Sequence, residues 1–228
     1  GQWSYCLESS KNSPSAGEKT AEELVNSNEM VSKLLYYGFG GPAALPGELD
    51  GTGNGLFDDG LSTPETHYLY THVLLSIAYS GDLMGVDLDG LESLGIGLKG
   101  LYNYIASLPA PQDPSLSDNF TAYFDSDIRM QKTNTVTFNA TENATINVTL
   151  QDGVTLHNIS TGKSGNGVVS VSGGQSFYLT APMNVFEDYT SGNIAGNNCT
   201  RFVPLAIYGS GNTQSHGSYT YDIANLTY

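Results

Sequence analysis

The chain has 228 residues, enough for one large domain or two small ones, and enough to bury a substantial core. Its net charge of -15, from 8 basic and 23 acidic residues, argues against nucleic acid or anionic membrane as a partner, because both bind clusters of Lys and Arg. A composition rich in Gly, Ser, Thr, Asn and Tyr is typical of surface or secreted proteins. No apolar run is long enough to span a bilayer and no signal peptide is present, so we expect a mature fragment without membrane insertion.

A first helix is predicted over residues 20–37. Thr20 and Glu23 have the spacing of a capping box, in which each side chain bonds the backbone N–H of the other residue. Apolar residues then recur on one helical face as far as Leu35. Gly38 is a typical residue for the end of this helix.

Two more helices are predicted before the middle of the chain. One begins at Pro64, with Thr63 as its N-cap, and ends before Gly81. The other covers residues 91–108 and is closed by Pro109. Its apolar residues are spaced three and four apart: Leu91, Leu94, Leu98, Leu101, Ile105 and Leu108.

After Pro114 the hydrophobic period changes from that of a helix to that of a strand. Alternating segments separated by Gly, Ser and Asn turns predict a small antiparallel sandwich, and further strands follow near the end of the chain. The expected strand segments are 135–150, 153–160, 167–174, 176–182, 201–209 and 219–228.

These elements predict an α+β fold of mostly antiparallel strands with an inserted helical subdomain. We expect a single domain over residues 1–228. Residues 1–118 and 200–228 would form its main body, and residues 119–199 a β-sandwich-like insertion.

Metal sites are not expected. None of the four histidines has a zinc-ligand spacing with a cysteine. Residues 50–61, "DGTGNGLFDDGL", resemble the start of a calcium loop, with Asp50, Thr52 and Asn54 in order. The twelfth position is Leu61, where a bidentate Glu is needed, so we interpret this segment as a glycine-rich loop.

The two cysteines, Cys6 and Cys199, support at most one disulfide. A Cys6–Cys199 disulfide is the default in a secreted chain, and a buried inert thiol is the second possibility. A third possibility is that Cys6 is a nucleophile. The residues around Cys6 and three other segments favour this third interpretation.

The segment "YCLE", Tyr5–Glu8, is followed by a Lys and a Pro in "KNSP". Residues 34–42 read "LLYYGFGGP", residues 70–82 read "YTHVLLSIAYSGD", and residues 202–217 read "FVPLAIYGSGNTQSHG". In this order the segments resemble the thioester domains of Gram-positive bacterial surface adhesins. They are similar to that family's aromatic-Cys-apolar signature, its "LYYG" helix end, its Thr-Gln-x-Ala-Ile-Trp helix and its carboxyl-terminal Gln.

The resemblance implies an internal thioester between the sulfur of Cys6 and the side-chain carbonyl of a Gln. A thiolate attacks the carboxamide and ammonia leaves. Fixing the two groups on neighbouring strands makes this otherwise negligible reaction feasible, since effective molarities of about 10⁵–10⁸ M are available to well-oriented pairs. Aromatic residues such as Trp3 and Tyr5 would keep water away from the acyl carbon.

Gln214 is our choice for the glutamine of the thioester, and Gln175 is the alternative. Gln214 follows the strand that returns to the main body, as the family's arrangement implies, although residues 215–218 match the family's Gln-x-x-apolar-apolar pattern poorly. Tyr178 and Leu179 give Gln175 the better match. Gln175, however, begins a strand inside the predicted sandwich.

His72 stands where the helix motif of the family usually carries Gln, and Tyr79 falls near its Trp. With an ordinary pKa near 6.5, His72 is a candidate for taking the proton of an attacking amine. The other interpretation of His72 is a hydrogen-bonding residue that only shapes the site. His216, two residues after Gln214, is a second candidate for the same role.

The resemblance predicts a cell-wall-anchored extracellular adhesin domain, monomeric and without a cofactor. Its thioester would acylate a lysine of a host surface or matrix protein once per molecule, so we do not expect an enzyme. Two other classes were weighed. One is a non-covalent ligand-binding domain with a Cys6–Cys199 disulfide. The other is a secreted hydrolase, which is disfavoured because the chain lacks a nucleophile elbow, a suggestive carboxylate pair and a metal motif.

Cys199 has a predictable state under the thioester hypothesis. It should be a free thiol, because the chain has no third cysteine. Since Cys199 follows Asn198 in a polar turn, we expect it to be partly exposed. A thiol reagent should then modify Cys199 alone in the native protein.

Overall fold

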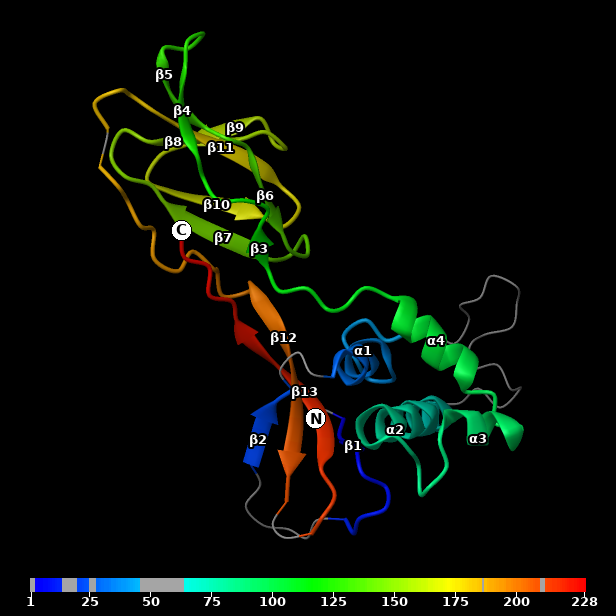
Figure 1. Ribbon diagram of the computed structural model, residues 1–228. Helices are drawn as coiled ribbons and strands as arrows, with labels where there is room; N and C mark the ends of the chain where they lie inside the picture. The colour runs from blue at the N-terminus through cyan, green and yellow to red at the C-terminus, as the bar shows by residue number, and fades with distance from the viewer. Residues whose placement is uncertain (1–2, 14–19, 25–27, 46–63, 186, 210–211) are drawn as a thin grey trace. The chain divides into compact units, whose positions relative to one another are not determined.

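The computed structural model describes residues 3–13, 20–24, 28–45, 64–185, 187–209 and 212–228. The chain divides into two compact units (Figure 1). The first contains Gly1–Pro111 and Val203–Thr220, and the second contains Gln112–Phe202 and Tyr221–Tyr228. The final residues therefore join the second unit instead of the main body, because Ala224 and Leu226 are buried in its core.

The sheet of the first unit has the strand order β1-β13-β12-β2. β1 (Tyr5–Cys6) pairs antiparallel with β13 (His216–Ile223). β12 (Thr200–Tyr208) pairs antiparallel with β2 (Thr20–Glu23) on its other side. The two ends of the chain thus meet at β1 and β13.

The capping box predicted at Thr20 is wrong, because Thr20–Glu23 form strand β2. Pairing with β12 satisfies the backbone groups of this segment, so a tertiary contact overrides the local helix signal. The helix α1 begins later, at Glu29–Tyr37, and is capped by Asn28, whose Oδ1 accepts a hydrogen bond from the Val31 N–H at 3.2 Å. Gly38 follows α1, as predicted, and its N–H donates to the Leu34 carbonyl at 2.9 Å.

Helix α2 (Pro64–Ser80) has the predicted bounds, with Gly81 after its last residue at a φ of 92°. The proposed cap Thr63 and the rejected calcium loop lie outside the described residues. Helix α2 contacts α1 and strand β1, so it forms one wall beside Cys6. Leu74 and Leu75 are fully buried there.

The single helix predicted over residues 91–108 is two helices, α3 (Leu88–Ser93) and α4 (Lys99–Ser107). The chain turns between them at Gly95, whose φ of 80° lies in the left-handed region that only glycine adopts at low cost. Leu94 is consequently 69% exposed, contrary to the expected face. Leu98 and Leu101 are buried, as the pattern predicted.

The second unit is built from short antiparallel strands in two sheets. β10 (Val168–Ser172) pairs with β7 (Thr145–Thr149) in a two-stranded sheet. The other sheet has the order β3-β6-β11-β5-β4, with β8 added to β11 and β9 to β8. Its strands are β3 (Ser115–Leu116), β4 (Ala122–Asp125), β5 (Met130–Thr133), β6 (Val136–Asn139), β8 (Thr155–Asn158), β9 (Lys163–Gly165) and β11 (Ser176–Ala181).

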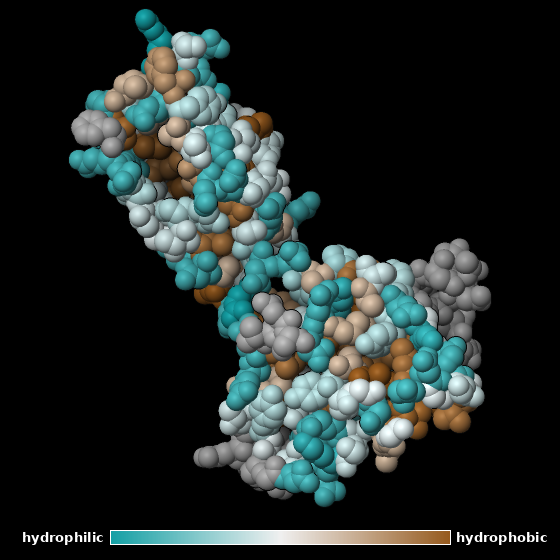
Figure 2. Space-filling model, in the orientation of Figure 1, coloured by the Kyte–Doolittle hydropathy of each residue, from teal (hydrophilic) through white to brown (hydrophobic). Residues whose placement is uncertain are grey.

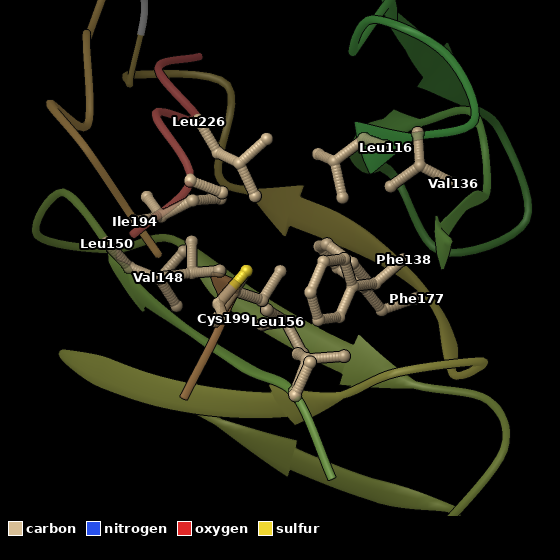
Figure 3. Close-up of a cluster of buried hydrophobic side chains, with 14 residues drawn as sticks. Leu116, Val136, Phe138, Val148, Leu150, Leu156, Phe177, Ile194, Cys199 and Leu226 are labelled. Atoms are coloured by element: carbon tan, nitrogen blue, oxygen red, sulfur yellow. The ribbon is translucent and has the colours of Figure 1, made fainter. Parts of the chain in front are cut away.

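The core of the second unit lies between these sheets, where apolar side chains point toward one another (Figure 3). Phe138 and Phe177 are fully buried in it. Cys199 is also fully buried in this cluster, so its predicted partial exposure is wrong. The turn after Asn198 is polar, but the Cys199 side chain points into the sandwich, where the thiol packs as a small hydrophobe.

An apolar hollow also belongs to the second unit. A cavity of about 340 Å³ is lined by apolar residues such as Phe120, Leu150 and Leu179, with Asn119 and Gln151 among its polar neighbours. Brown, apolar residues are visible on this unit among teal and white polar ones (Figure 2).

The predicted fold class is confirmed, since helices are few and the paired strands described above are antiparallel.

Candidate functional site

Cys6 lies at the end of the short strand β1, directly opposite His216 of β13. Its neighbours Tyr5 and Leu7 are buried. The buried Ser76 of α2 donates a hydrogen bond from Oγ to the Cys6 carbonyl at 3.0 Å. Cys6 itself is partly exposed, and its backbone is held on both sides, by β13 and by Ser76 of α2.

Gln214 is brought to Cys6 by the same strand pairing. The Leu7 N–H donates to the Ser215 carbonyl at 2.9 Å, which continues the β1–β13 ladder beyond His216. Since residues two apart share a face of a strand, Gln214 occupies the position diagonal to Cys6. Gln214 is 4% exposed, and its amide lowers the pKa of the neighbouring Cys6 thiol.

Further bonds fix the orientation of Gln214. Its backbone N–H donates to the Asn12 carbonyl at 3.0 Å, and its Nε2 donates to Ser13 Oγ at 2.9 Å. Asn12 also forms a parallel bridge with Thr213. The amide is therefore held between the Cys6 sulfur and the segment that follows Glu8.

The pKa of Cys6 reflects this environment. Burial raises the pKa of the thiol, and the hydrogen bond from Gln214 lowers it by a smaller amount, so the pKa lies above its ordinary value. The sulfur is therefore a neutral thiol at neutral pH. Bond formation with the Gln214 carbonyl would have to rely on proximity and orientation more than on a stable thiolate.

Glu8 connects the strands that carry Cys6 and Gln214. Its Oε2 accepts hydrogen bonds from the Ser215 N–H and Oγ, both at 2.9 Å, and its Oε1 forms an ion pair with Lys11 Nζ at 2.6 Å. Burial raises the pKa of Glu8, but the hydrogen bonds from Lys11 and Ser215 outweigh it, so the pKa is lower than usual. Glu8 is consequently ionised at neutral pH.

Aromatic rings surround the site. The Tyr5 ring stacks on the Tyr68 ring with centroids 5.0 Å apart, and Trp3 contacts Phe39 and Tyr68 at 5.0 and 5.5 Å. Tyr5 OH donates to the Phe39 carbonyl, and a Cβ on Gly40 would collide with the Trp3 ring. Burial and the neighbouring Cys6 raise the pKa of Tyr68, whose hydroxyl donates to the Ser4 carbonyl at 3.2 Å.

His72 faces the same cluster from helix α2. Its ring makes edge contacts with Tyr68 and Tyr5, at 5.9 and 6.4 Å between centroids. Burial lowers the pKa of His72, and the nearby His216 lowers it further, so His72 is neutral at neutral pH. His216 Nδ1 lies 3.1 Å from Ser4 Oγ. The structure thus places His216 opposite Cys6, and it places His72 near His216 and against the ring of Tyr5, the residue before Cys6.

Gln175 belongs to the second unit, where it has a structural role. Its Oε1 accepts hydrogen bonds from Asn158 Nδ2 at 2.8 Å and from the Ser172 N–H at 3.0 Å. The Cys6–Cys199 disulfide of the alternative hypothesis is wrong for this structure, because both cysteines are free thiols and Cys199 is enclosed in the sandwich core. The choice between the two glutamines stays a prediction, and the geometry around Cys6 supports Gln214.

Several residues of the site were missed in the sequence. Tyr68 and Ser76 had a detectable signal, because each lies four residues from His72 and therefore on the same face of the predicted helix. Glu8 and Ser215 had none. Their contact joins residues 207 positions apart and depends on the register of β1 against β13.

Two family models match the chain in succession. Residues 1–112 match the model described as "Thioester domain", and residues 115–198 match the model described as "TED associated beta sandwich domain". A search of the curated proteins found no match. The two models divide the chain close to the boundary between the compact units at Pro111.

Solved structures show the same fold. The Bacillus anthracis TIE protein has a TM-score of 0.60 and 19% identity, covering 100% of this chain and 41% of that chain. The thioester domain of the Enterococcus faecium TIE86 protein has a TM-score of 0.54 and 15% identity, covering 100% of this chain and 81% of that chain. This chain therefore spans less than half of the Bacillus anthracis structure.

The predicted resemblance is thus confirmed: the chain is a thioester-domain protein, with a thioester domain followed by its associated β-sandwich. The match to this family supports the interpretation of the chain as a thioester-type adhesion domain. Thioester domains are found in surface adhesins. Among the helices of the described residues, none has the length and apolarity needed to cross a membrane.

Proposed function

We propose that this domain carries an internal thioester between Cys6 Sγ and the Gln214 side-chain carbonyl, and that it uses this bond to attach covalently to a host protein. The observation that carries the proposal is the pairing of β1 with β13, continued by the Leu7–Ser215 hydrogen bond, which brings the buried Gln214 diagonally across from Cys6. Cys6 lies on β1, Gln214 lies two residues before the paired strand β13, and Gln214 is almost fully buried.

Thioester formation would proceed by attack of Cys6 sulfur on the Gln214 amide carbon. The new S–C bond replaces the C–N bond, and the nitrogen leaves as ammonia with the thiol proton. The strand pairing and the bonds of Gln214 to Asn12 and Ser13 supply the orientation. The rings of Trp3, Tyr5 and Tyr68 restrict the access of water to the acyl carbon.

The acceptor would be a primary amine, the lysine side chain of a host surface or matrix protein. Its nitrogen attacks the acyl carbon, the C–S bond breaks, and the amine proton is transferred to the released Cys6 sulfur. The product is an amide that joins Gln214 to the partner. Each molecule reacts once, so the domain is a single-use acylating adhesin of an extracellular, cell-wall-anchored protein and not a catalyst.

Methylamine and a thiol reagent test this proposal together. Native protein should lack the mass of one ammonia and should resist labelling, because Cys6 is bonded and Cys199 is buried. Methylamine should add its own mass and release one thiol, which peptide mapping should place at Cys6. Cys199 should react only after denaturation, since burial also raises the pKa of its thiol. A native mass without the ammonia loss would refute the proposal.

His72 is proposed to accept the proton of the attacking amine, since burial keeps its imidazole neutral. Replacing His72 by Ala should slow methylamine capture by on the order of 10²-fold, while the ammonia loss is retained. The ratio of wild-type to variant rates cancels the titration of the amine itself. This ratio should fall toward one as the pH drops through the pKa of His72, which lies below about 6.5.

His157 provides a matched control for this experiment. It also has a pKa lowered by burial, but it lies in the second unit, where it stacks on Tyr178 at 4.8 Å. His157→Ala should leave the capture rate unchanged. If His72→Ala captures methylamine as fast as the wild type at all pH values, His72 only shapes the site.

A further inference from the structure

The chain has a primary amine of its own in the segment that contacts the glutamine of the proposed thioester. Lys11 follows Cys6 by five positions and is the lysine nearest to it in the sequence. The two residues after Lys11 both contact the reactive glutamine, Asn12 through its carbonyl and Ser13 through its hydroxyl. A thioester at Gln214 would therefore face an internal competitor for the acyl group.

Lys11 is held by Glu8. Its Nζ lies 2.6 Å from Glu8 Oε1, and its N–H donates to the Glu8 carbonyl at 3.1 Å. The other carboxylate oxygen of Glu8 is occupied by Ser215, the residue after Gln214. These contacts fix Glu8 in place, and its Oε1 holds the Lys11 ammonium.

Resting on the proposed function, we infer that Glu8 guards the thioester against self-acylation by Lys11. The ion pair holds the Lys11 side chain on Glu8 Oε1 and so restrains it from reaching the acyl carbon. The hydrogen bonds from Ser215 fix the Glu8 carboxylate to the segment that carries Gln214. External lysines are not restrained in this way, so the acyl group is kept for a partner.

The reaction that Glu8 prevents has a defined product. Neutral Lys11 Nζ would attack the Gln214 acyl carbon, forming a C–N bond and breaking the C–S bond. The amine proton would pass to the released Cys6 sulfur. The mass of the protein would not change, but Cys6 would become a free thiol and a Lys11–Gln214 amide would link the two segments.

Glu8→Gln tests the inference, because glutamine keeps an acceptor oxygen for Ser215 but cannot form the ion pair. At about pH 8, where the neutral fraction of lysine amines is larger, the variant should lose methylamine-reactive protein roughly twofold to fivefold faster than the wild type. Peptide mapping should find the Lys11–Gln214 cross-link and a labelled Cys6.

Two double variants distinguish protection of the thioester against Lys11 from a purely structural role of Glu8. Glu8→Gln with Lys11→Arg should restore the wild-type lifetime, because a guanidinium is not readily acylated. Glu8→Gln with Lys99→Arg should decay like Glu8→Gln, since Lys99 pairs with Asp89 elsewhere in the first unit, at 2.6 Å.

Three outcomes would overturn the inference that Glu8 protects the thioester against Lys11. The Glu8→Gln variant could be as stable as the wild type, could form no thioester, or could decay equally with and without Lys11 by addition of one water and no cross-link. In each of these cases a wild type that lacks one ammonia keeps the proposed function intact. A wild type that has not lost the mass of one ammonia would instead refute both the proposed function and the inference about Glu8.

Discussion

Replacing either Cys6 or Gln214 by alanine should abolish covalent capture of amines and restore the mass of the lost ammonia. Each variant removes one of the two atoms that form the bond, so no partial activity is expected. The loss should be complete, because the bond depends on an effective molarity of about 10⁵–10⁸ M that no external thiol or amide can match. Intact mass spectrometry and a gel-shift assay with a lysine-rich protein measure both effects.

Gln175→Ala is the control for the choice of glutamine. It should keep the ammonia loss and the capture, while removing the acceptor for Asn158 Nδ2 and the Ser172 N–H. Leaving these donors unpaired should destabilise the second unit by about 1–3 kcal/mol. If Gln175→Ala alone abolished the bond, the chemistry would stand and the assignment of Gln214 would be wrong.

Phe177→Ala should be the most destabilising of these substitutions. The side chain is fully buried at the centre of the sandwich core, opposite Val136 and Asn158 in the neighbouring strands. Removing the ring leaves a cavity and should lower the free energy of unfolding by about 3–5 kcal/mol. Chemical denaturation, followed by the near-UV signal or by labelling of the buried Cys199, measures this loss.

Phe124→Ala is the matched control, because the same ring is 56% exposed on strand β4. This substitution should change the free energy of unfolding by less than about 0.5 kcal/mol. Both variants should keep the mass deficit, since Cys6 and Gln214 belong to the first unit. Equal losses for Phe177→Ala and Phe124→Ala would contradict the core assigned to the second unit.

Local patterns in the sequence were sufficient for much of the fold. The bounds of α2, set by Pro64 and Gly81, and the alternating strands after Pro114 were predicted correctly. The break between α3 and α4 was not, although Gly95, Gly97 and Gly100 weaken a helix there. Helical spacing continues through this break, but the chain turns at Gly95, and Leu98 and Leu101 are buried after the turn.

Tertiary contacts decided the cases in which a local signal was misleading. Thr20 and Glu23 carry a helix signature, yet pairing with β12 makes them a strand. Cys199 sits in a polar turn, yet its side chain enters the sandwich core. In both cases the free energy of a long-range contact exceeds the small local preference, which is below about 1 kcal/mol per residue.

The sequence by itself was sufficient to recognise the family and to predict a site, because Cys6, the helix of His72 and Gln214 occur in recognisable order. Only the tertiary structure placed Gln214 against Cys6 and joined Glu8 to Ser215 and Lys11. A motif is encoded in neighbouring residues, whereas the register of two strands from opposite ends of the chain is fixed by the packing of the whole unit. Cys6 and Gln214 can be proposed from the sequence, but the contacts that surround them exist only in the fold.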